Sequence, residues 1–197
     1  DSTLFIVTAN AWMNHPAGFD IVNGQVVNVD PIAAMFNPGW FPEVLHMTLA
    51  AYLATAAAVA AIHAFGLLRD HDNLFHRRAL AIALAVMAPA AVLQPISGDL
   101  NARLAAQTQP AKLAAFEGQF KTEAGAPLTI LGIPDPDAGV TRYGIEIPYG
   151  LSILAFHDPA ATVTGLLDFP RDQWPPTQVV HPAFDLMVGA GMALMGV

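Results

Sequence analysis

The chain has 197 residues, of which 54% are hydrophobic and only 12% are charged. So few charged side chains cannot cover the surface of an ordinary soluble domain, which excludes that class and indicates a membrane protein. The formal net charge of −8 argues against a nucleic acid as a partner. The chain has no cysteine, which excludes disulfides and thiolate metal sites.

The two ends of the chain are apolar but too short to cross a membrane. Residues 1–12 are predicted to be the end of a transmembrane helix, and residues 13–42 a loop. Residues 183–197 are predicted to be the start of another transmembrane helix, interrupted only by Asp185. Because the chain also begins without Met or a basic signal region, we expect an interior fragment of a longer membrane protein, cut inside one helix at each end.

Two segments between these ends are predicted to span the membrane completely. The first is 43–68, in which residues 44–68 form a run of 25 residues without Asp, Glu, Lys or Arg. About 20 such residues suffice to cross a hydrocarbon core roughly 30 Å thick. The second is 79–97, whose interruptions at Pro89 and Gln94 neighbouring helices can accommodate. The pair predicts a helical hairpin.

The distribution of basic residues predicts the orientation of this hairpin. Arg69, Arg77 and Arg78 lie in its connection, residues 69–78, whereas residues 1–44 contain no Lys or Arg. By the positive-inside rule the connection is cytoplasmic, and the loops 13–42 and 98–182 are extracytoplasmic. The predicted fold class is therefore all-α, a polytopic transmembrane helical bundle with a long extracytoplasmic loop. A loop this long is expected to be a folded lid.

Within the long loop, the stretch TQPAKLAAFEGQF, residues 108–120, has a helical pattern. Pro110 suits a first helical position, and Leu113, Phe116 and Phe120 predict one apolar stripe. Lys112 and Glu117 are five residues apart, so on a helix they do not form a simple surface pair, and a solvated face is their usual role. Asp99, at the end of the second spanning segment, is expected to cap the following helical turn.

His46 is the polar group that the first spanning helix must accommodate. One interpretation is a packing histidine bonded to a neighbouring helix or to interfacial water. The other is a ligand to haem iron, which accepts a neutral imidazole. Met187 is then a candidate second ligand, because it lies about one turn into the terminal apolar stretch. Methionine in an apolar helix is, however, usually core filler.

Several motifs occur in an order that resembles the central part of subunit I of the cytochrome bd family of quinol oxidases, from the end of its fourth helix to the start of its seventh. They are ANAWMNHPAGF, FNPGWFPEVLHMTLAAYLAT, SGDLNAR, QPAKLAAFEGQF, GIPD, IPYGLSILAF and FDLMVGAG. The resemblance implies that His46 and Met187 are axial ligands of a low-spin haem b. It also implies that the long loop binds membrane quinol, with Lys112 and Glu117 taking part in its oxidation.

The same resemblance implies the setting of the protein. It implies a multi-pass protein of the bacterial cytoplasmic membrane, with the long loop on the outer face. The implied partners are subunit II and the rest of subunit I, and further b- and d-type haems reduce oxygen at a site outside this chain. The chain alone is thus not expected to reduce oxygen. No residue distinguishes ubiquinol from menaquinol.

Chemically, a carboxylate such as Glu117 can accept a quinol hydroxyl proton, and Lys112 can hold a quinol oxygen. One position departs from the family. Two residues before the matching methionine, members commonly carry arginine, whereas this chain has Asp185. A negative charge there would disfavour haem reduction. Asp185 therefore also motivates an alternative hypothesis, a haem-free membrane scaffold or ion- or proton-transport protein that keeps the helical framework.

Overall fold

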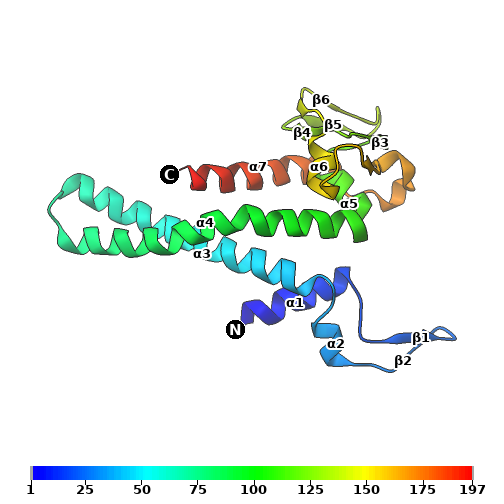
Figure 1. The fold of residues 1–197 in the computed structure, drawn as a ribbon, viewed down its shortest axis with the longest axis horizontal. Coiled ribbons are helices and arrows are strands. Elements are labelled where there is room, and N and C mark those ends of the chain that lie inside the picture. Colours follow the sequence, from blue (N-terminus) through cyan, green and yellow to red (C-terminus); the bar gives the residue numbers. More distant parts are fainter. Residues whose placement is uncertain (1, 197) are drawn as a thin grey trace. The chain divides into compact units, whose positions relative to one another are not determined.

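The computed structural model describes residues 2–196, which form two compact units, residues 2–98 and 99–196, and each unit is described by itself. The structure is mostly helical, as predicted, but the described residues also contain short strands (Figure 1). The elements up to the end of the hairpin are α1 Ser2–Asn14, β1 Asp20–Val22, β2 Gln25–Val27, α2 Pro31–Met35, α3 Trp40–Arg69 and α4 Leu74–Thr108.

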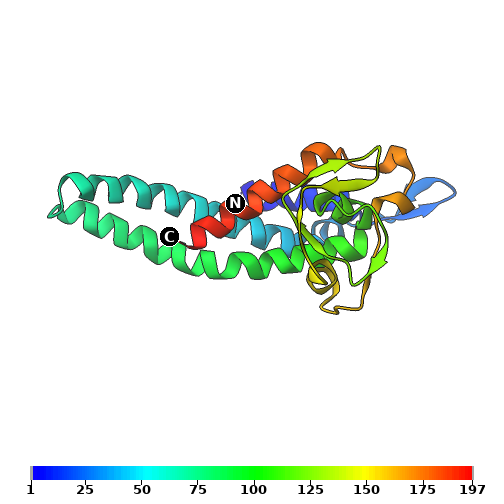
Figure 2. The same cartoon turned by 90° about the horizontal axis from the view of Figure 1, so that it is seen from above.

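Helices α3 and α4 form a long antiparallel hairpin and lie side by side in both Figure 1 and Figure 2. Both are long and apolar enough to cross a membrane. Most of their large apolar side chains are exposed, including Ile62, Phe65 and Ile82, which suits contact with lipid or with further helices. Near the connection, His63 Nδ1 and His76 Nδ1 are 2.8 Å apart and hydrogen-bonded, so each imidazole has a partner.

The helices extend beyond the segments predicted from hydropathy. The connection shortens to residues 70–73, and α4 continues to Thr108. Hydropathy marks only the apolar part of a helix, whereas good helix formers continue the hydrogen-bond ladder into polar sequence. The expectation that Asp99 caps a helix is therefore wrong. Asp99 lies inside α4, where it pairs with Arg103 one turn later (3.0 Å) and with His157 (3.0 Å).

Two local signals explain the segment between α1 and α3. Asn23 and Gly24 both have positive φ (53° and 77°), and they connect β1 and β2 as a two-residue hairpin turn. Asp30 caps α2 by accepting hydrogen bonds from the backbone N–H groups of Ile32 (2.9 Å) and Ala33 (3.1 Å). The all-α prediction overlooked the Asn-Gly signal.

The second unit is built around the short helix α5, Pro110–Phe116. Its other elements are β3 Glu123–Ala124, β4 Leu128–Ile130, β5 Ile133–Asp135, β6 Val140–Arg142, β7 Ile145–Ile147, α6 Gly150–Phe156, β8 Thr162–Val163, the 3-10 turns Leu166–Asp168 and Arg171–Gln173, and α7 Thr177–Met195. The strands pair antiparallel as β3–β8, β4–β7 and β5–β6, and in Figure 2 they gather beside α5 and α6.

Two hydrophobic clusters meet at α5. Leu113 packs with Ala126, Leu151, Ala155 and Val163 in one cluster. Ala114 and Ala115 pack in the other, together with Phe120 and Leu166. Residues 98–182 are thus largely a folded unit with cores of its own.

Helix α5 is shorter than predicted. Pro110 occupies its first turn, as expected, but the helix ends at Phe116. Gly118 has a φ of 63°, and the N–H of Gln119 bonds to the carbonyl of Ala114 (2.8 Å), which is a glycine-based helix end. Phe120 is therefore buried after a turn and does not continue a helical stripe.

Gly165 lies close against the backbone of Phe120 and Lys121 in the second unit. A Cβ at this position would overlap the carbonyl of Phe120 and the backbone of Lys121, neither of which can move easily. We expect Gly165→Ala to destabilise the unit by about 2 kcal/mol, as overpacking typically does. Thermal unfolding of the intact protein in detergent measures the change. Gly189→Ala, whose Cβ would meet no atom within 4 Å, is the control, and equal melting of the two variants would contradict the prediction.

Candidate functional site

His46 lies on α3 and is held by two residues of α4. Its Nδ1 is 2.9 Å from Ser97 Oγ, and that hydroxyl donates its own proton to the carbonyl of Gln94 (2.8 Å). Ser97 can therefore only accept from His46, so the proton of a neutral ring is on Nδ1 and the lone pair is on Nε2. Of the two interpretations from sequence, a histidine bonded to a neighbouring helix describes these contacts.

The contact with Ser97 also fits a haem ligand. A metal-binding imidazole donates its other N–H to a fixed acceptor, which sets the tautomer, and Ser97 is such an acceptor. The lone pair on Nε2 faces the Gln94 amide nitrogen at 3.2 Å. The amide oxygen of Gln94 is buried and has no hydrogen-bond partner among the described residues, so Gln94 is an incompletely satisfied neighbour of the ring.

Met187 lies on α7 and is 54% exposed. Its sulfur is thus not confined to the core of the second unit, which leaves it open to a ligand role. His46 belongs to the first unit and Met187 to the second. Their pairing as axial ligands stays a prediction.

The two residues of the predicted quinol site are on α5 and at its end. Lys112 is half-buried, with Nζ 5.7 Å from the centroid of the Phe116 ring. Glu117 caps the helix and is only 4% exposed. The usual role as a solvated face therefore does not apply to Glu117.

The environment of Glu117 changes its acidity. Burial, together with the smaller effect of the nearby Asp185 carboxylate, raises the pKa of Glu117 to about 8. Glu117 is thus mostly protonated at neutral pH and becomes a carboxylate only around pH 8. A group with a pKa close to the working pH suits acid–base chemistry.

His181 was missed by the sequence reasoning, although it is completely buried beside this site. Its Nδ1 is 2.7 Å from the carbonyl oxygen of Phe116, the residue before Glu117. Its Nε2 is 3.2 Å from the carbonyl of Leu131 and 3.5 Å from Asp185 Oδ2. The spacing of His181 and Asp185, four residues on one helix, was the signal that could have found the pair.

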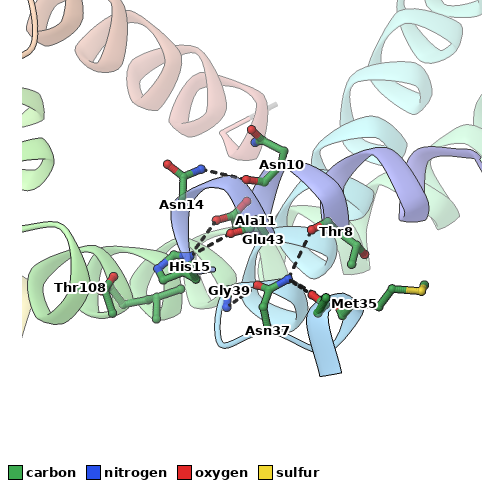
Figure 3. Close-up of polar contacts among 12 residues, drawn as sticks. Thr8, Asn10, Ala11, Asn14, His15, Met35, Asn37, Gly39, Glu43 and Thr108 are labelled. Atoms are coloured by element: carbon green, nitrogen blue, oxygen red, sulfur yellow. Dashed lines mark hydrogen bonds and ion pairs between the residues drawn. The ribbon is translucent and has the colours of Figure 1, made fainter. Parts of the chain in front are cut away.

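A second polar cluster fixes the start of α3 (Figure 3). His15 is buried, with Nδ1 3.3 Å from the carbonyl of Ala11 and 4.0 Å from Glu43 Oε1. Glu43 lies in the first turn of α3, where a carboxylate favours the helix dipole. Buried Asn37 accepts a hydrogen bond from the Gly39 N–H (3.0 Å). These contacts position the first turn of the helix that carries His46.

With this geometry in place, comparison with known proteins identifies the family. Residues 1–197 match the family cytochrome bd terminal oxidase subunit I along their whole length. The chain belongs to this family. The resemblance inferred from the motifs is thereby confirmed.

Named relatives agree with the family. A Bacillus subtilis (strain 168) protein that carries the provisional name cytochrome bd menaquinol oxidase subunit I is 40% identical over 98% of the chain. The cytochrome bd-II ubiquinol oxidase subunit 1 of Escherichia coli (strain K12) is 34% identical over 94%. The chain spans only 44% and 37% of these two relatives.

The structure is also similar to a solved one. The bd oxidase from Geobacillus thermodenitrificans matches with a TM-score of 0.88 and 43% sequence identity, over 98% of this chain and 44% of that one. The mostly helical fold with two long apolar helices is therefore a bd oxidase fold.

The raised pKa of Glu117 predicts how stability depends on pH. The folded protein holds this proton up to about pH 8, whereas the unfolded chain releases it near the ordinary value of 4.5. The contribution to stability is therefore complete below the unfolded pKa and is lost as pH rises through the folded one. We expect Glu117→Gln, which cannot ionise, to gain melting temperature over the wild type between pH 6 and pH 9, measured in detergent. A difference in melting temperature between the two proteins that stays constant from pH 6 to pH 9 would contradict this prediction.

Proposed function

We propose that this chain is the electron-entry part of a quinol:oxygen oxidoreductase, which oxidises membrane quinol at the 98–182 loop and passes the electrons toward oxygen. The family match over the whole chain and the names of the relatives support this proposal. One relative is named for menaquinol and another for ubiquinol, so the substrate proposed is the class they share, a membrane quinol. Buried Glu117, with its pKa near 8, is the observation that carries the chemistry.

His46 and Met187 are proposed to hold a low-spin haem b. When bound, this haem supplies an acceptor for single electrons. Ser97 fixes the His46 ring with the lone pair on Nε2, the form that binds iron. Met187 offers an exposed thioether on α7.

Glu117 and Lys112 are proposed to handle the quinol itself. Oxidation of a quinol releases two protons, so the site needs a base with a route to water. As a carboxylate, Glu117 accepts a proton from a quinol hydroxyl group. Lys112, half-buried and five residues earlier, donates a hydrogen bond to a quinol oxygen.

The remainder of the enzyme is proposed to lie outside this chain. It consists of the rest of subunit I, subunit II, and further b- and d-type haems at which oxygen is reduced. We place the protein in the bacterial cytoplasmic membrane, with the 98–182 loop on the outer face, so that quinol protons are released outside. Asp185, which motivated a haem-free alternative, lies 3.5 Å from His181 Nε2, and its Oδ2 makes no hydrogen bond among the described residues. An optical spectrum of the intact oxidase distinguishes the two hypotheses.

The ligand assignment predicts a spectroscopic outcome. In the intact oxidase, His46→Ala and Met187→Ala are each expected to remove the low-spin haem b signal from a quinol-reduced minus oxidised optical spectrum. His63→Ala, on the same helix but paired with His76, is the control and should leave this signal intact. An unchanged spectrum in the His46 variant would refute the assignment, and absence of haem in the folded wild-type protein would favour the haem-free alternative.

The role of Glu117 predicts a kinetic outcome. We expect quinol oxidation by the wild type to accelerate as pH rises toward 8, because the carboxylate is the accepting form. The charged or titratable groups around the turn that carries Glu117 are Lys112 on α5 and His181 and Asp185 on α7. Glu117→Gln should be slower by about 10²-fold and should lack this acceleration, with a largely unchanged haem spectrum. Glu146→Gln, an exposed carboxyl in the same loop, is the control. Wild-type turnover in the Glu117 variant would count against proton acceptance.

A further inference from the structure

The ring of His181 is surrounded by oxygen atoms that act as acceptors. It is fully buried, and its two nitrogens face the backbone carbonyls of Phe116 (2.7 Å) and Leu131 (3.2 Å). A carbonyl oxygen only accepts hydrogen bonds. The ring can therefore bond to these carbonyls only by donating an N–H group, and the contact with Phe116 is the shorter of the two.

Asp185 on α7 is a third neighbour of the ring. Its Oδ2 lies 3.5 Å from His181 Nε2, and its side chain is only 15% exposed. His181 is thus contacted from α7 itself and from two other segments of the unit.

These contacts hold the turn that carries Glu117 from both sides. His181 binds the carbonyl of Phe116, and its ring lies against Gly118, where a Cβ would be 3.3 Å from the ring. Thr141 donates a hydrogen bond to the carbonyl of Gly118 (2.7 Å). The backbone before and after Glu117 is thus fixed, although Glu117 lies at the end of a short helix.

We propose that His181 is a positioning residue for quinol oxidation: its buried ring ties the Glu117 turn to α7 and to the turn at Leu131. It acts through Glu117 and does not contact the quinol. The proposal rests on the proposed function of Glu117. The stacked rings of Phe116 and Phe184, 5.0 Å apart, hold α5 to α7 independently, so loss of His181 should misplace Glu117 without releasing the helix.

Three substitutions separate the contacts. His181→Asn places an N–H donor where Nδ1 is and keeps the bond to Phe116. His181→Gln extends its donor toward Leu131, and His181→Leu removes both bonds. Because misplacement of a reacting group by about 1 Å can cost on the order of 10²-fold in rate, we expect kcat to fall by about this factor in His181→Leu. His181→Asn should recover most of the rate and His181→Gln less.

The experiment measures kcat and KM for quinol oxidation by the intact oxidase, together with haem content and the infrared carbonyl band of protonated Glu117, assigned as the band that Glu117→Gln removes. We expect kcat to change more than KM, the band to shift in His181→Leu, and the haem spectrum to stay unchanged. Wild-type kcat and an unshifted band in folded His181→Leu would overturn the proposal.

Two comparisons keep the test decisive. If His181→Leu does not fold, wild-type kcat in both the Asn and the Gln variants, or better recovery by Gln than by Asn, overturns the proposal. The proposed function fails differently: the wild type then does not oxidise quinol, or Glu117→Gln retains full turnover, whatever the His181 variants do.

Discussion

The packing of α5 is the constraint on which the candidate quinol site depends. Leu113 contributes to one hydrophobic cluster of the second unit, and Ala114 and Ala115, both fully buried, contribute to the other. Since core atoms are close-packed, a helix held on two sides has little freedom to move. The chain leaves this helix at Gly118, and Glu117 consequently lies inside the unit and not on its surface.

Burial of a carboxyl group disfavours its charged form, and Glu117 is therefore protonated at neutral pH. Glu117 stays neutral up to about pH 8, partly because Asp185 is already negative nearby. His181 lies between two carbonyls and this aspartate. The resulting group of three side chains contains one residue, Glu117, whose pKa lies near physiological pH. Buried groups with shifted pKa values are typical of functional sites.

In the candidate haem site of the first unit, a histidine is likewise held in place by its neighbours. His46 on α3 is oriented by Ser97 and Gln94 of α4, and Ser97 is itself oriented by a bond to the Gln94 backbone. A hydroxyl that has donated its proton can only accept, so the tautomer of the imidazole is decided by a neighbour. Both sites thus contain a histidine whose ring is held by fixed neighbours.

The sequence by itself determined the two long apolar helices and the family, because hydropathy, helical period and motif order are local properties of a chain. It also predicted His46, Met187, Lys112 and Glu117 as site residues. It also predicted a helix at Pro110, but not its end at Phe116, nor the continuation of α4 past Asp99. Only the tertiary structure decided that Glu117 is buried and that His181 belongs to its site. The carbonyls that meet His181 come from residues 65 and 50 positions away. Contacts over such separations depend on how the elements pack, and no local pattern encodes them.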